Sequence, residues 1–112
     1  MMNWSDKLSA IRMDLRGLNR TIPDTTRAFN ELGKAAKEGG VLDANTKEFV
    51  ALGISVADHC EPCIGLHIEA LIKVGASREE VADVLGMCIQ MGGGPSLMYA
   101  AKALTCFDEL SA

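Results

Sequence analysis

The sequence has few aromatic residues, no cluster of basic residues and no long apolar run. Aromatic residues make up only 4% of the 112 residues, so the core is expected to consist of aliphatic side chains, alanine and methionine. Lysine and arginine are scattered and the formal net charge is -4, whereas phosphate binding needs a concentrated basic face. No stretch approaches the ~20 apolar residues of a membrane span. We therefore expect a globular protein with neither nucleic acid nor membrane as a partner.

The N-terminal segment also lacks the apolar stretch of a secretory signal peptide, because charged residues interrupt residues 1–20. A cytoplasmic location follows as an expectation, and thiols are kept reduced there. The length fits one domain that spans residues 1–112. In such a chain the four cysteines favour redox or metal chemistry over structural disulfides, particularly where two of them form a C-x-x-C pair.

Strand signals are weak, and six segments with helical periodicity predict an all-α fold. Caps, prolines and glycines predict the helix boundaries. The first expected helix runs from a cap at Ser5 to about Leu18, the second from Pro23 to the Gly39-Gly40 pair, and the third, capped by Asp43, from roughly Ala44 to Asp58. The fourth has Pro62 in its first turn and ends just before Gly75, the fifth runs from a Ser77–Glu80 capping box up to the glycines at Gly92, and the sixth from Pro95 to about Leu110. The glycine run at residues 92–94 lacks the Gly-Lys-Ser/Thr ending of a phosphate loop, so we interpret it as a helix break.

Apolar residues at three- and four-residue steps predict which side of each helix faces inward. Cys88 and Cys106 lie on such apolar sides and are expected in the core. The other residues expected on these sides are Leu8, Ile11, Leu15 and Leu18 in the first helix, Phe29 and Leu32 in the second, Val81, Val84 and Leu85 in the fifth, and Met98, Ala101, Leu104 and Thr105 along one side of the last.

The segment from Cys60 to His67 carries the candidate chemistry, and it reads Cys-Glu-Pro-Cys-Ile-Gly-Leu-His. Pro62 favours a helix start beside Cys60, which places Cys63 in the first turn, where backbone amides are unpaired and the helix dipole is positive. This environment favours thiolate over thiol. His67 follows Cys63 by four residues, so the two side chains share one face and the imidazole can take or relay the thiol proton. The two sulfurs can also close a small disulfide, so that one cysteine attacks an oxidant and the other resolves the product.

Other interpretations of these residues remain open. Cys60 and Cys63 could be two core thiols, since free cysteine is often buried. Together with His59 and His67 they could bind zinc, but structural zinc sites usually draw their ligand pairs from two separate segments, and we expect no metal. A thioredoxin-like function needs a βαβ setting, and no strand is predicted before the motif. His59 is expected only to end the preceding helix.

Glu48 lies twelve residues before Cys60, a distance of ~18 Å along a single helix, so contact with the motif requires the next helix to fold back antiparallel. By itself this residue is typical of a first-turn glutamate favoured by the helix dipole. The spacing Glu48-x11-Cys60-x2-Cys63-x3-His67, however, resembles the signature of the alkylhydroperoxidase AhpD-like, or carboxymuconolactone decarboxylase, family.

This resemblance covers about residues 42–101, including the Ser77 cap and the glycine break near Gly92, and says little about residues 1–40. It implies an AhpD-like helical fold in which an antiparallel helical hairpin carries the C-x-x-C site. It also implies a homo-oligomer, commonly a trimer or hexamer. One position departs from the family pattern, because the better-studied peroxidase members have a histidine where this chain has Pro62.

The resemblance further implies a peroxidase-type site made of Cys63, Cys60, His67 and Glu48. In family members the cysteine matching Cys63 becomes a sulfenic acid, and the one matching Cys60 donates a proton and forms the disulfide. The residues matching His67 and Glu48 form a proton relay. We therefore expect a thiol-dependent reductase of hydrogen peroxide or alkyl hydroperoxides, regenerated by a dithiol or a protein thiol and needing no cofactor. The alternatives are a lactone-acid decarboxylase, as in other branches of the family, and a non-catalytic, redox-sensing oligomeric module.

Overall fold

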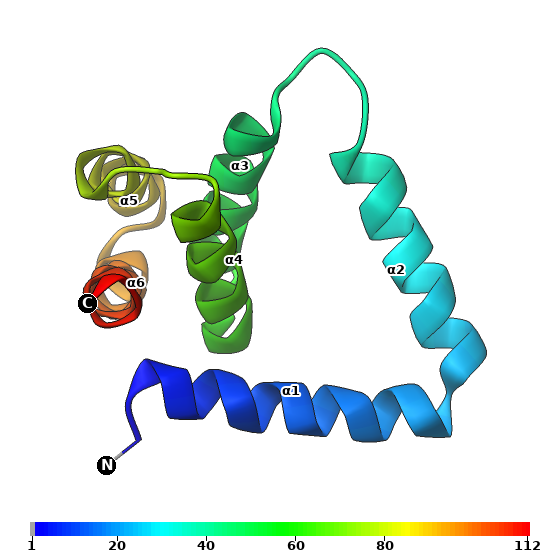
Figure 1. Cartoon of the computed structure of the whole chain (residues 1–112). Helices are drawn as coiled ribbons and strands as arrows, with labels where there is room; N and C mark the ends of the chain where they lie inside the picture. Colours follow the sequence, from blue (N-terminus) through cyan, green and yellow to red (C-terminus); the bar gives the residue numbers. More distant parts are fainter. Residues whose placement is uncertain (1) are drawn as a thin grey trace.

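The computed structural model describes residues 2–112, and these residues form an all-α fold (Figure 1). The six helices are α1 (Trp4–Thr21), α2 (Pro23–Lys37), α3 (Ala44–Ala57), α4 (Glu61–Lys73), α5 (Arg78–Gly92) and α6 (Gly94–Ser111). Residues 2–112 contain no strand, so the predicted fold class is confirmed. Within this described part, no helix is both long enough and apolar enough to cross a membrane.

The core lies where α3 and α4 pack along each other and α5 and α6 close over one side of the pair (Figure 1). Its members are mostly aliphatic, as the scarcity of aromatic residues predicts. Fully buried side chains come from each of these four helices, and include Leu52, Val56, Ile64, Ile68, Leu71, Val81 and Cys106. Trp4 and Phe107 are the buried aromatic members. The pair α3–α4 is therefore held rigidly by its neighbours, and it carries all of the predicted site residues.

The first two helices are arranged differently. The start of α1 lies across one end of the α3–α4 pair, where Trp4 and Leu8 are buried against α4. Beyond that contact α1 and α2 form an L-shaped arm (Figure 1), which meets the other helices again through the Arg12–Glu69 ion pair and at the last turn of α2, where Lys37 reaches Glu48 of α3. No residue of α2 is buried within the chain.

This arrangement contradicts two of the predicted inner faces. In α1 only the first part of the expected side is buried, and Leu15 and Leu18 are exposed. In α2 the expected inner residues Phe29 and Leu32 are 71% and 64% exposed. The periodicity marks the apolar sides of these helices, but residues 2–112 leave Leu15, Leu18, Phe29 and Leu32 uncovered.

The buried side of α6 also differs from the predicted one. Of the predicted residues, Met98, Ala101 and Thr105 are exposed and Leu104 is half-buried. The core side instead consists of Ser96, Ala100, Ala103, Cys106 and Phe107. Small residues on this side let α6 approach its neighbours closely, and hydrophobicity alone does not reveal that preference.

Side-chain caps determine most helix starts. The predicted capping box of α5 is present, with the Glu80 amide donating to Ser77 Oγ at 3.0 Å and the Ser77 amide donating to Glu80 Oε1 at 2.8 Å. The Asp43 side chain caps α3, as predicted. Gly75 follows α4 with a φ of 82°, a left-handed conformation that glycine adopts without strain.

The start and end of α1 differ from the prediction. The cap is Asn3, whose side chain accepts a hydrogen bond from the Asp6 amide at 2.9 Å, and Ser5 lies inside the first turn. The helix continues to Thr21, so that only Ile22 separates it from Pro23, which begins α2. Asparagine and serine are both good caps, so the sequence alone did not discriminate between the two positions.

Candidate functional site

The turn between α3 and α4 places both motif cysteines at the start of α4. The Cys60 amide donates to the Ser55 carbonyl at 3.0 Å across the end of α3, which closes the turn tightly. His59 has a φ of 56° in this turn, a left-handed conformation usually left to glycine. Cys60 is then the N-cap of α4, and Pro62 lies in the first turn as predicted.

Cys60 and Cys63 form a disulfide in this structure, with their Cα atoms 5.2 Å apart. The backbone amide of Cys63 donates to Cys60 Sγ at 3.2 Å, so this sulfur takes the place of a capping oxygen. Both residues are half-buried rather than enclosed in the core. The pair therefore lies at the positive end of a helix dipole, which stabilises negative charge on sulfur when the disulfide is reduced.

Glu48 and His67 form the second part of the site. Glu48 lies on α3 and is only 8% exposed, and its Oε2 is 2.7 Å from Nδ1 of His67 on α4. This contact requires α3 and α4 to be antiparallel, as predicted from the distance between Glu48 and the motif along the chain. Because a carboxylate accepts hydrogen bonds, the pairing favours the imidazole tautomer that carries its proton on Nδ1. Nε2 is then left as the acceptor.

The predicted site residues thus fall into two bonded pairs on one helical hairpin. Glu48 joins His67 by a hydrogen bond, and Cys60 joins Cys63 by a covalent bond. The pairs are connected through α4, on which His67 follows Cys63 by four residues, about one turn. Their catalytic roles remain predictions.

His59 does more than end α3. Its ring stacks on Tyr99 of α6, with centroids 4.7 Å apart and an angle of 11° between the planes. This contact holds the turn before Cys60 against α6. The zinc alternative is not supported by the geometry, because the His59 ring is engaged with Tyr99 and residues 2–112 contain no group of three or more His, Cys, Asp or Glu side chains placed to hold a metal ion.

Glu61, the residue after Cys60, anchors the start of α4 to two other helices. Its carboxylate binds Lys7 of α1 at 3.0 Å and Lys102 of α6 at 3.5 Å. The hydrogen bond from Lys7 lowers the pKa of Glu61, and the charge of both lysines acts in the same direction against partial burial. The motif is therefore held from both sides by ion pairs.

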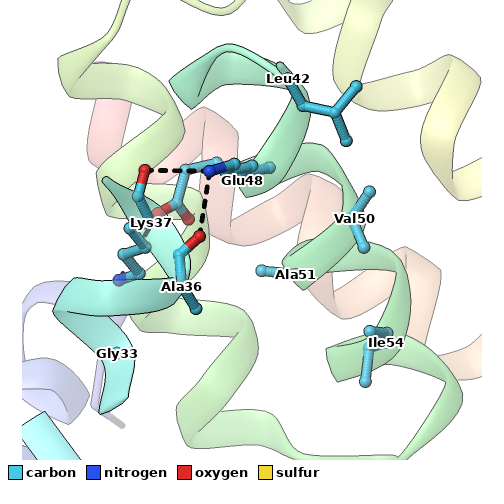
Figure 2. Close-up of a pocket in the computed structure, with 9 residues that line it drawn as sticks. Gly33, Ala36, Lys37, Leu42, Glu48, Val50, Ala51 and Ile54 are labelled. Atoms are coloured by element: carbon cyan, nitrogen blue, oxygen red, sulfur yellow. Dashed lines mark hydrogen bonds and ion pairs between the residues drawn. The ribbon is translucent and has the colours of Figure 1, made fainter. Parts of the chain in front are cut away.

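Two lysines complete the site on the side of α2, and sequence reasoning did not identify them. Lys37, the last residue of α2, places Nζ 3.6 Å from Oε1 of Glu48. Lys47 donates from Nζ to the carbonyls of Ala36 at 3.0 Å, Lys37 at 3.3 Å and Gly39 at 2.7 Å, as Figure 2 shows for the first two. The sequence signal was weak, since a basic residue in the last turn of a helix is usually explained by the helix dipole.

A pocket of about 300 Å³ opens beside Glu48 between α2 and α3 (Figure 2). The charged groups in its lining are Lys37, Lys47 and Glu48, and the remaining residues are Gly33, Ala36, Leu42, Val50, Ala51 and Ile54. The pocket is thus largely apolar with charge at one end. Oε1 of Glu48 pairs with Lys37 beside this pocket, while Oε2 binds His67.

The other two cysteines lie outside the site. Cys106 is fully buried, as predicted, and burial raises the pKa of its thiol to about 12. Cys88 was also expected in the core but is only half-buried, with its sulfur 3.7 Å from the Gly53 carbonyl. Burial raises the pKa of the Cys88 thiol too. Burial of these two thiols therefore disfavours their reactive thiolate forms.

Comparison with known proteins agrees with the fold. A solved carboxymuconolactone decarboxylase family protein from Legionella pneumophila is 43% identical, covers 97% of each chain and superposes with a TM-score of 0.93. A Thermotoga maritima structure is 29% identical over 94% of this chain and 93% of that chain, with a TM-score of 0.80. An uncharacterized protein of Cupriavidus necator is 39% identical over 95% of this chain and 94% of its own length. The sequence model of the carboxymuconolactone decarboxylase family matches residues 23–105. The chain therefore belongs to the carboxymuconolactone decarboxylase family, as the spacing of Glu48, Cys60, Cys63 and His67 predicted.

Proposed function

We propose that this protein is a thiol-dependent reductase of hydrogen peroxide or alkyl hydroperoxides, a member of the AhpD-like branch of its family. The observation that carries the proposal is the pairing of a Cys60–Cys63 disulfide at a helix N-terminus with a Glu48–His67 hydrogen bond on the same hairpin. Neither pair alone is specific to thiol peroxidase chemistry. Together they supply a nucleophile, a resolving thiol and a base held in one orientation.

The reaction begins from the reduced pair. The Cys63 thiolate attacks the terminal oxygen of the hydroperoxide, the O–O bond breaks, and the leaving alkoxide or hydroxide takes a proton to become an alcohol or water. Cys63 is oxidised to a sulfenic acid. The Cys60 thiol then condenses with it, and the products are the disulfide and one water. A dithiol or protein-thiol reductant exchanges with the disulfide and restores both thiols.

The Glu48–His67 pair handles the protons of this cycle. With its Nδ1 proton held by Glu48, the imidazole of His67 can accept the Cys63 proton at Nε2 and later return it to the leaving oxygen. Glu48 is nearly buried, so its hydrogen bond with the ring is not weakened by competing water. The helix dipole at the start of α4 favours the thiolate at the same time.

Substitution of the proposed nucleophile tests this function. The Cys63→Ser variant should lose hydroperoxide turnover, because serine cannot form a sulfenic acid, whereas Cys88→Ser should retain it as a matched control. Turnover is measured as consumption of cumene hydroperoxide with dihydrolipoamide as the reductant. Undiminished turnover by Cys63→Ser would reject the assignment.

The alternative functions predict different results in the same variants. A lactone-acid decarboxylase would release carbon dioxide from its substrate even when both Cys60 and Cys63 are replaced by serine, because decarboxylation needs no thiol pair. A non-catalytic redox sensor would form the Cys60–Cys63 disulfide once per oxidant without sustained turnover. The disulfide in the structure favours thiol redox chemistry over decarboxylation.

We also propose that the protein assembles as a homo-oligomer, a trimer or hexamer. Support comes from the apolar side of α2, where Phe29 and Leu32 are largely exposed because no helix of residues 2–112 covers them. Val50 and Ile54 on α3 are also more than half exposed. Large apolar side chains exposed on two neighbouring helices are typical of a protein–protein contact.

A further inference from the structure

We propose that Lys37 is a positioning residue of the Glu48–His67 pair, which holds the carboxylate in the orientation that lets the imidazole present Nε2 to the thiol. The inference rests on the proposed function and extends it to a residue on a different helix. The two oxygens of Glu48 are divided between two partners, Oε1 at 3.6 Å from Lys37 Nζ and Oε2 at 2.7 Å from His67 Nδ1.

The Glu48 carboxylate is largely removed from solvent. Glu48 is 8% exposed, and a carboxylate removed from water needs a compensating charge or several hydrogen bonds. Among the described residues, Lys37 is the one lysine or arginine within ion-pair distance of Glu48. His67 supplies a single hydrogen bond and is not permanently charged. The ammonium of Lys37 therefore provides the permanent positive charge beside this site.

Lys37 is held in place through its backbone carbonyl, which binds Lys47 of α3. Helix α2 buries none of its own residues, so ordinary core packing does not fix its last turn. Instead Lys47, one residue before Glu48, reaches back from α3 and donates to the carbonyls of Ala36 and Lys37 in the last turn of α2 and to that of Gly39 just after it. Figure 2 draws the first two of these bonds. A cation at unpaired C-terminal carbonyls is a favourable helix cap. The consequence is that the end of α2 and the start of α3 are tied together, with Lys37 beside Glu48.

The chemical effect follows from the tautomer. The Glu48 carboxylate accepts the Nδ1 proton and leaves Nε2 of His67 free to accept the thiol proton. By binding Oε1, the Lys37 ammonium keeps Oε2 directed at Nδ1 and so maintains the productive arrangement.

A set of variants tests this role. Reduced protein is mixed with one equivalent of cumene hydroperoxide, and the loss of free thiols is followed at pH 7. Lys37→Met should slow the reaction about 5-fold, the equivalent of ~1 kcal/mol for a partly exposed ion pair, and Lys37→Arg should restore the wild-type rate. Lys34→Met is the matched control: Lys34 is an exposed lysine of the same last turn and has no ion pair within residues 2–112, so its rate should not change.

A double substitution separates positioning from general structural damage. If Lys37 acts through Glu48, then Lys37→Met should cause no further loss in a protein that already carries Glu48→Gln. Helix content by circular dichroism should be the same in all variants. A Lys37→Met rate equal to that of Lys34→Met, or an undiminished 5-fold loss in the Glu48→Gln background, would overturn the inference.

A second readout keeps the inference independent of peroxidase activity. The rate at which iodoacetamide alkylates Cys63 in the reduced protein also depends on the base at His67, and Lys37→Met should slow it by a similar factor while Lys34→Met does not. Absence of hydroperoxide-dependent thiol loss in the wild-type protein would reject the proposed function but leave this alkylation test valid. Equal alkylation rates in the Lys37→Met and wild-type proteins would reject the positioning role itself.

Discussion

The packing of α1 over the start of α4 depends on Gly65, and one added methyl group tests it. A Cβ atom at this position would lie 2.9 Å from Leu8 Cδ2 and 3.0 Å from Trp4 Cζ3. These distances are shorter than van der Waals contact, so Gly65→Ala must displace Leu8 and Trp4. Both are buried, and the motif helix carries Gly65 between Cys63 and His67.

The magnitude follows from two opposing effects. Forcing an extra carbon into a packed interface typically costs about 1–3 kcal/mol. Replacing glycine by alanine inside a helix stabilises it by about 1 kcal/mol. Gly86 in α5 is the matched control, because an added Cβ atom there meets nothing within 4 Å and only the helix effect applies. The two variants should therefore differ by about 1–3 kcal/mol, with Gly86→Ala the more stable.

Thermal unfolding followed by circular dichroism at 222 nm, at equal protein concentrations, measures this difference. For a chain of this length it corresponds to a Tm difference of roughly 4–15 °C. Gly86→Ala should melt above the wild-type protein. If Gly65→Ala is as stable as Gly86→Ala, then α1 does not lie against α4 in solution as it does here, and the account of how the N-terminal arm is anchored is wrong.

Two further predictions concern the core thiol and the assembly. Burial raises the pKa of Cys106 to about 12, so iodoacetamide at pH 8 should leave Cys106 unmodified in the folded protein and label it in urea. The unfolded chain releases the Cys106 proton at pH ~8.5 while the folded chain holds it, so the free energy of unfolding should fall as the pH rises above that value. The Cys106→Ala variant should lack this fall, and the same dependence of the free energy of unfolding on pH in that variant would show that the thiol is not buried. Light scattering during gel filtration should give a mass of three or six times 11.9 kDa, and Phe29→Asp should lower it without loss of helix content, whereas a monomeric wild-type protein would refute the proposed assembly.

Local signals predicted the helices well, because helix ends are set by neighbouring residues. The capping box at Ser77, the cap at Asp43 and the end of α4 just before Gly75 all lie where the sequence placed them. The errors arose where two local choices were equivalent, as with Asn3 and Ser5 at the start of α1. They also arose where a buried side is built from small residues, as in α6.

Some residues of the candidate site could be predicted from the sequence and others could not. The linear motif identified Cys60, Cys63 and His67 because they share one helix start, and their spacing decides which side chains can meet. Glu48 was identified only through its resemblance to the family pattern, since its partner lies nineteen residues away. Lys37 was missed because its contact with Glu48 depends on how α2 returns toward α3, and no periodic pattern records that.

By itself the sequence determined the helical class, the helix boundaries to within a few residues, and the position of the thiol motif at a helix N-terminus, because all of these depend on interactions between residues close in the chain. Only the tertiary structure decided that Glu48 binds His67, that Lys37 and Lys47 join α2 to the site, and that the apolar side of α2 has no partner among residues 2–112. These features depend on the relative placement of separate helices. That placement is determined by packing and by the few ion pairs between helices, not by the order of residues within any one of them.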